Sequence, residues 1–557
     1  MEKIVIPPGL ELNSLKNTTF PDLCEVELKD GNTDYSTDGK MLFSANGKEL
    51  ILSLAAGMQK GTVHVPEYVT KIGSAAFRST ICSEIIFDNP DVSAEPSSFN
   101  DSVWLNTQLK DEGGVYVGNT FFLASSRNAL TIAEGTQRIS RLAFEKNVPV
   151  SLTTPVVPIA QMKRGAMGCK ELIVTSDRKI NWNGLSEWES LASVQLTKST
   201  RYKSIDGVVF SADGRELIFY PQCREEEEYM IPDGVQVIGR RAFAGQLYLK
   251  KVTMPKSVTA IRQAAFTGCR SLSIVELSDN IKEIPDATAF QTYGVFQDCR
   301  SLTSIKLPDG LWHLGSNAFR SAKSLSKISL PSSVQMIGEY AFYNTAITYI
   351  SLPDSLRIIG KGALCGTPGS QTHVTAYEGS ARGLVGALEA AAPGMADSTA
   401  NVIWRSAKIV MLDKNGARKD EIVIPLSLKH SSASYIDSAW NQPEFDYDEY
   451  DRAFEDVSDA NEKASLAIEA VSRGRELADS PYESYLRRTG TKVISRIINE
   501  CDEERIVEFL KQGYLTNAAL KSALKLCNEK GLNTAAAYIL SLTQKKSPAK
   551  KTMAIRL

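Results

Sequence analysis

A repeat of about 23 residues constrains the fold of this chain more than any other feature of its sequence. A large apolar side chain marks each unit and recurs at intervals of 23, 30, 23, 23 and 22 residues, at Phe243, Phe266, Phe296, Phe319, Phe342 and Leu364. A proline keeps a similar step, at Pro232, Pro255, Pro308, Pro331 and Pro353. One such unit cannot bury its own apolar side, so the period predicts a solenoid of stacked units.

Within one unit the apolar residues indicate a short strand followed by a turn. Ile305 and Leu307 alternate with Ser304 and Lys306, which is the period of a half-buried strand. Pro308 then removes a backbone donor and ends the hydrogen-bonded ladder. We expect the apolar pair of each strand, and the ring that follows it, to form the core.

This pattern resembles the BspA-like leucine-rich repeat family. Residues Ile328–Phe342 carry the motif I-x-L-P-x-S-V-x-x-I-G-x-x-A-F, and Gly268 with Cys269 supplies the Gly-Cys pair that follows a ring. The resemblance implies a leucine-rich-repeat solenoid of the bacterial type that serves protein interaction and brings no catalytic residues. The expected fold class is α/β, a solenoid of stacked short parallel strands with β-hairpin insertions, followed by a small all-α domain.

The N-terminal part of the chain shows the same repeat pattern, but less regularly. Val69–Phe77 and Arg138–Phe144 retain the second half of the unit. Tyr35–Ile51 matches Tyr202–Ile218, and each holds Asn-Gly or Asp-Gly between apolar runs, which predicts a β-hairpin. Val115–Leu123 is a third, less regular copy. We therefore predict degenerate repeats with hairpin insertions over 1–228 and regular BspA-like repeats over 229–371.

After the repeats the pattern changes twice. Residues 372–405 predict a strand, a helix and a short return strand, an atypical last unit that would cap the solenoid. Residues 406–442 predict a strand-containing linker with its turn at Lys414–Gly416.

From about Asp459 the apolar period becomes helical, and Asp502, Thr516 and Asn533 are candidate N-caps. Residues 443–545 are therefore predicted as a helical module, weakly similar to ankyrin units but without their Thr-Pro-Leu-His signature. The lysine-rich residues 546–557 are predicted as a disordered basic tail.

Composition and charge bear on the partners and the location of the protein. A net charge of −2 gives no sign of a nucleic-acid or anionic-membrane partner. The sequence contains no run of 18 apolar residues, so no membrane-spanning helix is predicted. The start of the chain has no apolar signal region, which favours a cytoplasmic location. A secreted or surface-exposed protein is the alternative, if a leader has been removed.

Candidate metal and catalytic residues are sparse. Nine cysteines are scattered without a C-x-x-C pair, and the shared repeat position of Cys269 and Cys299 favours small buried side chains. The acidic stretch Asp30–Asp38 resembles a calcium loop but has Tyr35 where the loop requires glycine and Met41 where it requires glutamate. None of the four histidines has metal-ligand spacing. We predict no metal, no cofactor and no catalytic residue.

The sequence thus favours a non-enzymatic scaffold that binds a protein or peptide through its strand face. A cell-surface, adhesin-like protein is the alternative. In each unit the residues that alternate with the buried pair point outward. The predicted binding strip is Lys251, Thr253, Ile274, Glu276, Ser304, Lys306, Lys327, Ser329, Tyr349 and Ser351, with Tyr349 and Ile274 as anchors and Lys306 and Lys327 tuning the on-rate.

Overall fold

The computed structural model divides into two compact units, Met1–Ile281 with Val295–Leu302, and Lys282–Gly294 with Thr303–Leu557. The described residues are 3–11, 24–53, 61–110, 113–141, 143–145, 147–157, 168–185, 188, 190–287, 293–366, 372–390, 403–404, 407–425, 433–473, 477–478 and 480–545. The basic tail predicted at 546–557 lies outside these ranges.

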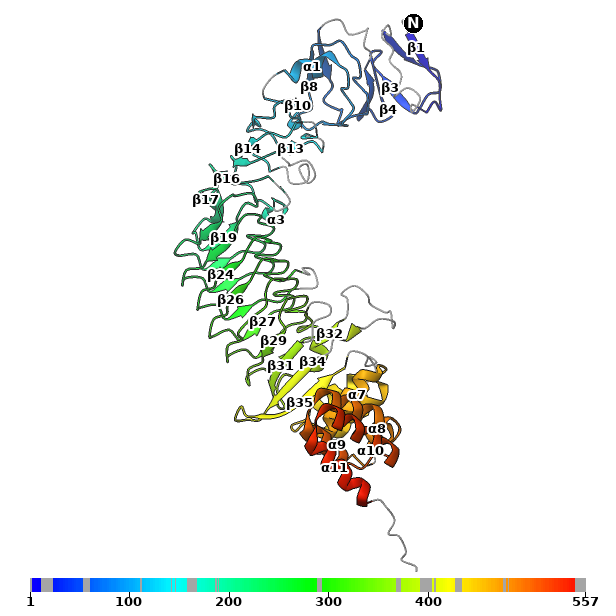
Figure 1. Ribbon diagram of the computed structural model, residues 1–557. Helices are drawn as coiled ribbons and strands as arrows, with labels where there is room; N and C mark the ends of the chain where they lie inside the picture. The colour runs from blue at the N-terminus through cyan, green and yellow to red at the C-terminus, as the bar shows by residue number, and fades with distance from the viewer. Residues whose placement is uncertain are drawn as a thin grey trace, which may run out of the picture. The chain divides into compact units, whose positions relative to one another are not determined.

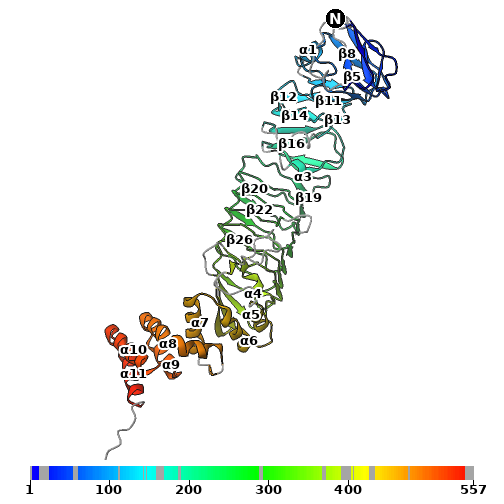
Figure 2. The ribbon, with the colours of Figure 1, turned by 90° about the vertical axis from the view of Figure 1, so that its right-hand side faces the viewer.

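The N-terminal unit contains two kinds of sheet. Purely parallel ladders are formed by β1 (Lys3–Ile6) with β2 (Glu25–Leu28), β6 (Thr62–Val65) with β8 (Glu84–Phe87), β12 (Ala129–Thr131) with β14 (Ser151–Thr154), β15 (Glu171–Val174) and β16 (Ser193–Leu196), and β20 (Glu228–Met230) with β22 (Lys251–Thr253) and β24 (Ile274–Glu276). Figure 2 shows β20 and β22 as successive rungs. Their pairing confirms the predicted stack of short parallel strands.

The other sheets of this unit begin with a hairpin and continue as a ladder. They are β3 (Tyr35–Thr37), β4 (Met41–Ser44), β5 (Glu49–Ser53), β7 (Lys71–Ile72) and β9 (Ser93–Ala94); β10 (Val115–Val117), β11 (Thr120–Leu123) and β13 (Arg138–Ile139); and β17 (Tyr202–Ile205), β18 (Val208–Ser211), β19 (Glu216–Phe219), β21 (Val237–Ile238) and β23 (Ala260–Ile261). The described residues of this unit also form two short helices, α1 (Val103–Gln108) and α3 (Trp182–Leu185).

The hairpin turns form as the sequence predicts. Gly47 and Gly214 have φ values of 73° and 78°, a backbone region that glycine enters without a steric penalty. The residue before each glycine accepts a hydrogen bond from a serine hydroxyl, at 2.8 Å for Asn46 and 2.6 Å for Asp213. All three predicted hairpins, including the less regular β10–β11 pair, are antiparallel.

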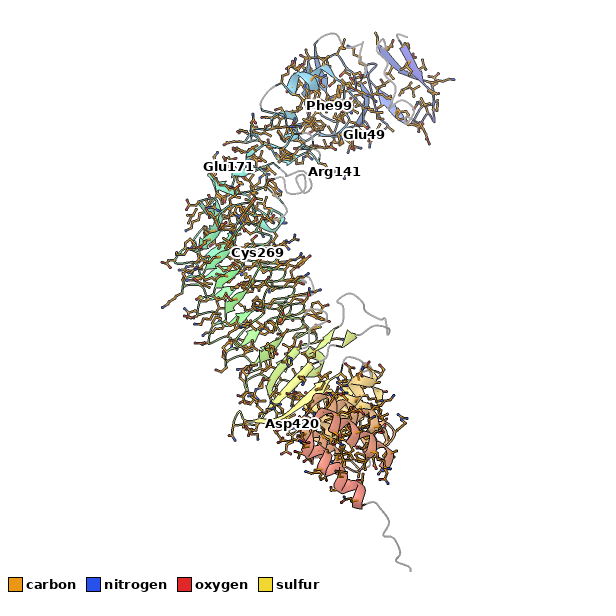
Figure 3. All side chains as sticks on the ribbon, in the orientation of Figure 1. Glu49, Phe99, Arg141, Glu171, Cys269 and Asp420 are labelled. Atoms are coloured by element: carbon orange, nitrogen blue, oxygen red, sulfur yellow. The ribbon has the colours of Figure 1, made fainter. Side chains whose placement is uncertain are left out.

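Stacked rings form the core of the regular repeats. In the N-terminal unit Phe243, Phe266 and Phe296 are fully buried, and their successive centroids lie 4.7 and 5.3 Å apart with nearly parallel planes. The thiol of Cys269, labelled in Figure 3, donates to the carbonyl of Phe243 at 3.0 Å, and Cys299 donates to that of Phe266 at 3.1 Å. Each of these two cysteines therefore ties its repeat to the backbone of the ring residue in the repeat before it.

The C-terminal unit contains the remaining strands. One parallel ladder is β25 (Glu283–Ile284), β27 (His313–Leu314), β28 (Met336–Ile337) and β30 (Ile358–Ile359). The strand face holds β26 (Ser304–Lys306) and the sheet β29 (Tyr349–Ser351), β31 (Thr372–Tyr377), β34 (Ala407–Leu412) and β35 (Arg418–Ile424), which Figure 1 shows side by side. A short antiparallel pair joins β32 (Glu389–Ala390) to β33 (Ile403–Trp404).

Within the segment predicted as a strand-containing linker at 406–442, β34 and β35 continue this sheet. β34 pairs in parallel with β31, and β35 returns antiparallel to β34. The predicted turn is present, because Gly416 has φ 80° and the Asp413 carboxylate accepts the backbone N–H of Asn415 at 2.8 Å. The predicted capping unit supplies β31, the short helix α4 (Leu384–Ala387) and the return strand β33.

Helices follow the sheet in the described part of this unit. They are α5 (Ala433–Trp440), α6 (Tyr447–Arg452), the 3-10 helix η3 (Ala453–Asp456), α7 (Ala460–Ser472), α8 (Pro481–Glu500), α9 (Glu503–Lys511), α10 (Asn517–Lys530) and α11 (Asn533–Lys545). Asp502 and Thr516 cap α9 and α10 as predicted, whereas Asn533 lies inside α11. These helices confirm the α-helical C-terminal module, and its similarity to ankyrin units stays a prediction.

Candidate interaction surface

In the N-terminal unit, the charges on the predicted strip neutralise one another. Lys251 of β22 lies 2.8 Å from the carboxylate of Glu276 on β24, and the Thr253 hydroxyl donates to the same carboxylate at 2.8 Å. The hydrogen bonds from Lys251 and Thr253 hold the pKa of Glu276 below its ordinary value, and the bond to Glu276 raises the pKa of Lys251. Ile274, 41% exposed, is therefore the apolar member that this half of the strip presents.

In the C-terminal unit, Tyr349 is the most prominent member of the strip. Its side chain is 68% exposed, more than that of any other described aromatic residue among the exposed large apolar ones. The ring stacks on the imidazole of His373, with centroids 4.5 Å apart and planes 9° apart, because β29 and β31 place these residues in register. Sequence reasoning did not place His373 on this face, although it alternates with the buried residues Thr372 and Val374.

The prediction that every unit contributes a paired strand is wrong at Lys327–Ser329. These residues form no strand and pair with neither β26 nor β29. The two apolar residues of this segment, Ile328 and Leu330, are only partly buried, whereas their counterparts Ile350 and Leu352 are 5% and 1% exposed. The other sheet of this repeat is not interrupted, since β27 and β28 remain paired. The interruption is therefore confined to the strand face.

Missing backbone hydrogen bonds define this interruption. In some intact rungs the residue after the strand donates to the next rung, as Met254 does to Glu276 at 2.9 Å and Leu352 does to Thr375 at 2.8 Å. The equivalent N–H groups of Leu307 and Leu330 have no hydrogen-bond acceptor among the described residues. Both sides of the 327–330 segment thus lack the bond that closes its neighbours.

A hollow of about 450 Å³ lies between β26 and the unpaired segment. Its walls are Ser304, Ile305, Lys306, Leu307 and Asp309 on one side and Lys327, Ile328, Ser329, Leu330 and Pro331 on the other. Four of the ten residues predicted to bind a partner, Ser304, Lys306, Lys327 and Ser329, therefore line one concavity. Neither lysine forms an ion pair with a described residue, unlike Lys251.

The stretch that resembles a calcium loop uses its polar groups locally. Asp34 accepts the N–H of Gly9 at 2.8 Å, and Asp38 accepts the N–H groups of Lys40 and Met41. The Asn32 amide donates to the carbonyl of Ile6 at 3.1 Å. Within the ranges given above, no group of three or more His, Cys, Asp or Glu side chains is placed to hold a metal ion.

Comparison with known families agrees with the repeat geometry. The model of the BspA type leucine rich repeat region matches 6 copies, over residues 57–155, 216–293 and 291–371. These residues are BspA-type leucine-rich repeats. The match to 57–155 places BspA-type repeats in the N-terminal unit, where the sequence pattern is less regular.

Several solved structures are similar to this chain. A leucine rich cell surface protein from Faecalibacterium prausnitzii is 23% identical and covers 58% of this chain and 94% of its own, with a TM-score of 0.34. The pneumococcal vaccine antigen PcpA is 16% identical over 61% and 82%, with a TM-score of 0.29. The T. pallidum leucine rich repeat protein is 26% identical over 32% and 86%, with a TM-score of 0.25.

No curated protein matches the chain. In the part of the chain that the structure describes, no helix combines the length and the apolar character needed to cross a membrane.

Proposed function

We propose that this chain is a non-enzymatic interaction scaffold that binds a protein partner through the strand face of its BspA-type repeats. The observation that carries the proposal is Tyr349, a large ring that is 68% exposed and held flat against His373. Tyrosine is frequent among the residues that dominate interface energies. Because stacking already fixes the ring, binding has little side-chain freedom left to remove.

The hollow between β26 and Lys327–Pro331 supports the same face. Lys306 and Lys327 have no ionic partner among the described residues and line the concavity. Exposed cations of this kind steer an acidic partner and raise its rate of association. In the N-terminal unit, Ile274 is proposed as a second apolar anchor. An adhesin-like surface protein is the alternative function, and secretion of the native full-length protein would favour it.

The test uses the full chain and its partner from the native cell. Photo-crosslinking residues are placed at Tyr349 and, as a matched control, at Trp312, which is 39% exposed and adjoins β27 on the other sheet of the same unit. We expect crosslinks from position 349 and none from 312. With the captured partner, Tyr349→Ala should cost about 2 kcal/mol of binding free energy and Trp312→Ala almost nothing. A folded Tyr349→Ala variant with parental affinity would refute the strand-face proposal.

A further inference from the structure

The interrupted rung of the C-terminal unit has the attributes of a peptide-binding slot. We propose that the hollow between β26 and Lys327–Pro331 binds an extended acidic segment of the partner, which pairs with the backbone as an added β-strand. This inference rests on the proposed function, because it names the kind of partner segment that the strand face takes. It goes further in assigning the contacts to the backbone of one interrupted rung.

Unpaired backbone groups are the first argument. The N–H groups of Leu307 and Leu330 are equivalent to those that Met254 and Leu352 donate to the next rung, and here they lack an acceptor among the described residues. An unpaired strand edge is a template for an incoming strand, and main-chain hydrogen bonds supply affinity in this mode of recognition. A peptide carbonyl beside Leu307 would restore the bond that Met254 makes to Glu276.

The shape of the site sets the length of the peptide. The walls are the short segments Ser304–Asp309, with six residues, and Lys327–Pro331, with five. At about 3.3 Å per residue, such a wall matches a peptide of four to six extended residues. The partly buried side chains of Ile328 and Leu330 offer apolar contacts to the peptide residues that face inward.

The charges that line the hollow favour acidic residues at the outward-facing positions of the peptide. Lys306 and Lys327 flank the hollow from opposite walls, whereas Asp309 is the only carboxylate among its described lining residues. The lysines are exposed and have no ionic partner among the described residues. Since successive side chains of a strand point to opposite faces, the expected ligand alternates acidic and apolar residues.

The binding test uses the full chain and a fluorescent hexapeptide in which aspartate or glutamate alternates with valine. Matched probes carry lysine in place of the acids, or N-methyl groups on alternate amides. We expect fluorescence anisotropy to show saturable binding of the acidic peptide only, with N-methylation raising Kd at least tenfold. Absence of saturable binding, or equal binding of the N-methylated peptide, overturns backbone pairing in the slot.

Variants locate the site. The double variant Lys306→Glu/Lys327→Glu should raise the Kd of the acidic peptide at least tenfold. Lys323→Glu, an exposed lysine of the same repeat outside the hollow, is the control and should change Kd less than twofold. An equal loss in the control and the double variant overturns the assignment, because it would show a general charge effect.

Hydrogen exchange tests the slot without any ligand. In the free protein, the amides of residues 304–307 and 327–330 should exchange faster than those of β31, and the acidic peptide should slow them. Equally slow exchange in the free protein overturns the interrupted rung. If the peptide fails to bind while partner capture still depends on Tyr349, the slot is refuted and the strand-face proposal stands.

Discussion

The rings of Phe319 and Phe342 lie parallel, with planes 1° apart and centroids 5.6 Å apart, one repeat after the other. Both are almost fully buried, at 0% and 1% exposure. Leu364 occupies the next equivalent position and is 4% exposed. This stack is the contact through which each repeat of the C-terminal unit buries the apolar side of its neighbour.

Truncating either ring should therefore destabilise the solenoid strongly. We expect Phe319→Ala or Phe342→Ala to lower the free energy of unfolding by about 3–5 kcal/mol, because lost burial and a residual cavity add. Phe319→Leu is the matched control and should cost less, since Leu364 fills this position natively. Urea unfolding measures both. A loss below about 1 kcal/mol for Phe319→Ala would contradict the assigned core position.

Arg473 joins the helices to the β34–β35 hairpin. Its guanidinium donates to the Glu421 carbonyl at 2.6 Å, lies 3.3 Å from the Asp420 carboxylate and covers the ring of Tyr450 at 5.7 Å. Its side chain is only 10% exposed, and Figure 3 labels Asp420 between hairpin and helices. Removing one partner of such a buried pair leaves an uncompensated charge.

We therefore expect Arg473→Ala to cost about 3–5 kcal/mol of stability, measured by urea unfolding of the helical far-ultraviolet signal. Arg487→Ala is the control, since Arg487 pairs with Glu483 at 2.7 Å but is 63% exposed. Exposed pairs contribute about 0.2–1 kcal/mol. Similar losses in both variants would show that the Arg473 contacts do not anchor the helices.

The predicted domain 443–545 can be tested on the same contacts. Expressed alone it should give a helical spectrum, because Asp459, Asp502 and Thr516 cap their helices within the fragment. Its unfolding midpoint should fall below that of the helical signal in the full chain, since Tyr450 and Arg473 lose their partners on β35. A coil spectrum would show that 443–545 does not fold by itself.

The sequence predicts the solenoid well because the repeat fixes which residues are buried. The alternation of Ser304 to Leu307 and the period of the rings suffice to place strands, rings and hairpins. Helix caps are equally local, so Asp502 and Thr516 were identified from residue type and spacing alone.

Two features of the repeats have no such signal. In most regular repeats the residue two positions before the ring has a positive φ, as at Asn317 with 58° and Tyr340 with 55°, and among these residues only Gly362 is a glycine. Gly294, which precedes Phe296, does not have a positive φ. The interrupted rung at Lys327–Ser329 carries the same pattern as its paired neighbours. Pairing depends on how two repeats stack rather than on one repeat's residues, so the hollow could not be predicted from the sequence.

Thiol reactivity tests the packing of the repeats. Cys24 and Cys501 are exposed and Cys223 is intermediate, whereas the other six cysteines are buried. Burial raises the pKa of Cys169 to about 12 and holds that of Cys299 well above its ordinary value. The thiolate is the reactive form. With a chromogenic disulfide at pH 8, we expect two thiols to react fast, one to react more slowly and six to react only after unfolding. Reaction of Cys269 or Cys299 before unfolding would contradict the stacking of the repeats.

Glu469 should make the stability of the helices depend on pH. Burial raises the pKa of this carboxyl above 4.5, against the attraction of Arg473, whose guanidinium lies 3.8 Å away. A raised pKa means that the carboxyl's contribution to stability is fully present below 4.5 and is lost as pH rises through the folded-state value.

Glu469→Gln keeps the shape of the side chain and removes that charge. The difference in Tm, variant minus parent, should therefore become more positive as pH rises from 4.5 through the raised folded-state pKa, and should level off above it. Thermal unfolding followed by the helical signal at a series of pH values measures this difference. A difference that does not change with pH would show that the ion pair with Arg473 offsets the burial of the carboxylate, whereas one that falls would show that the ion pair outweighs it.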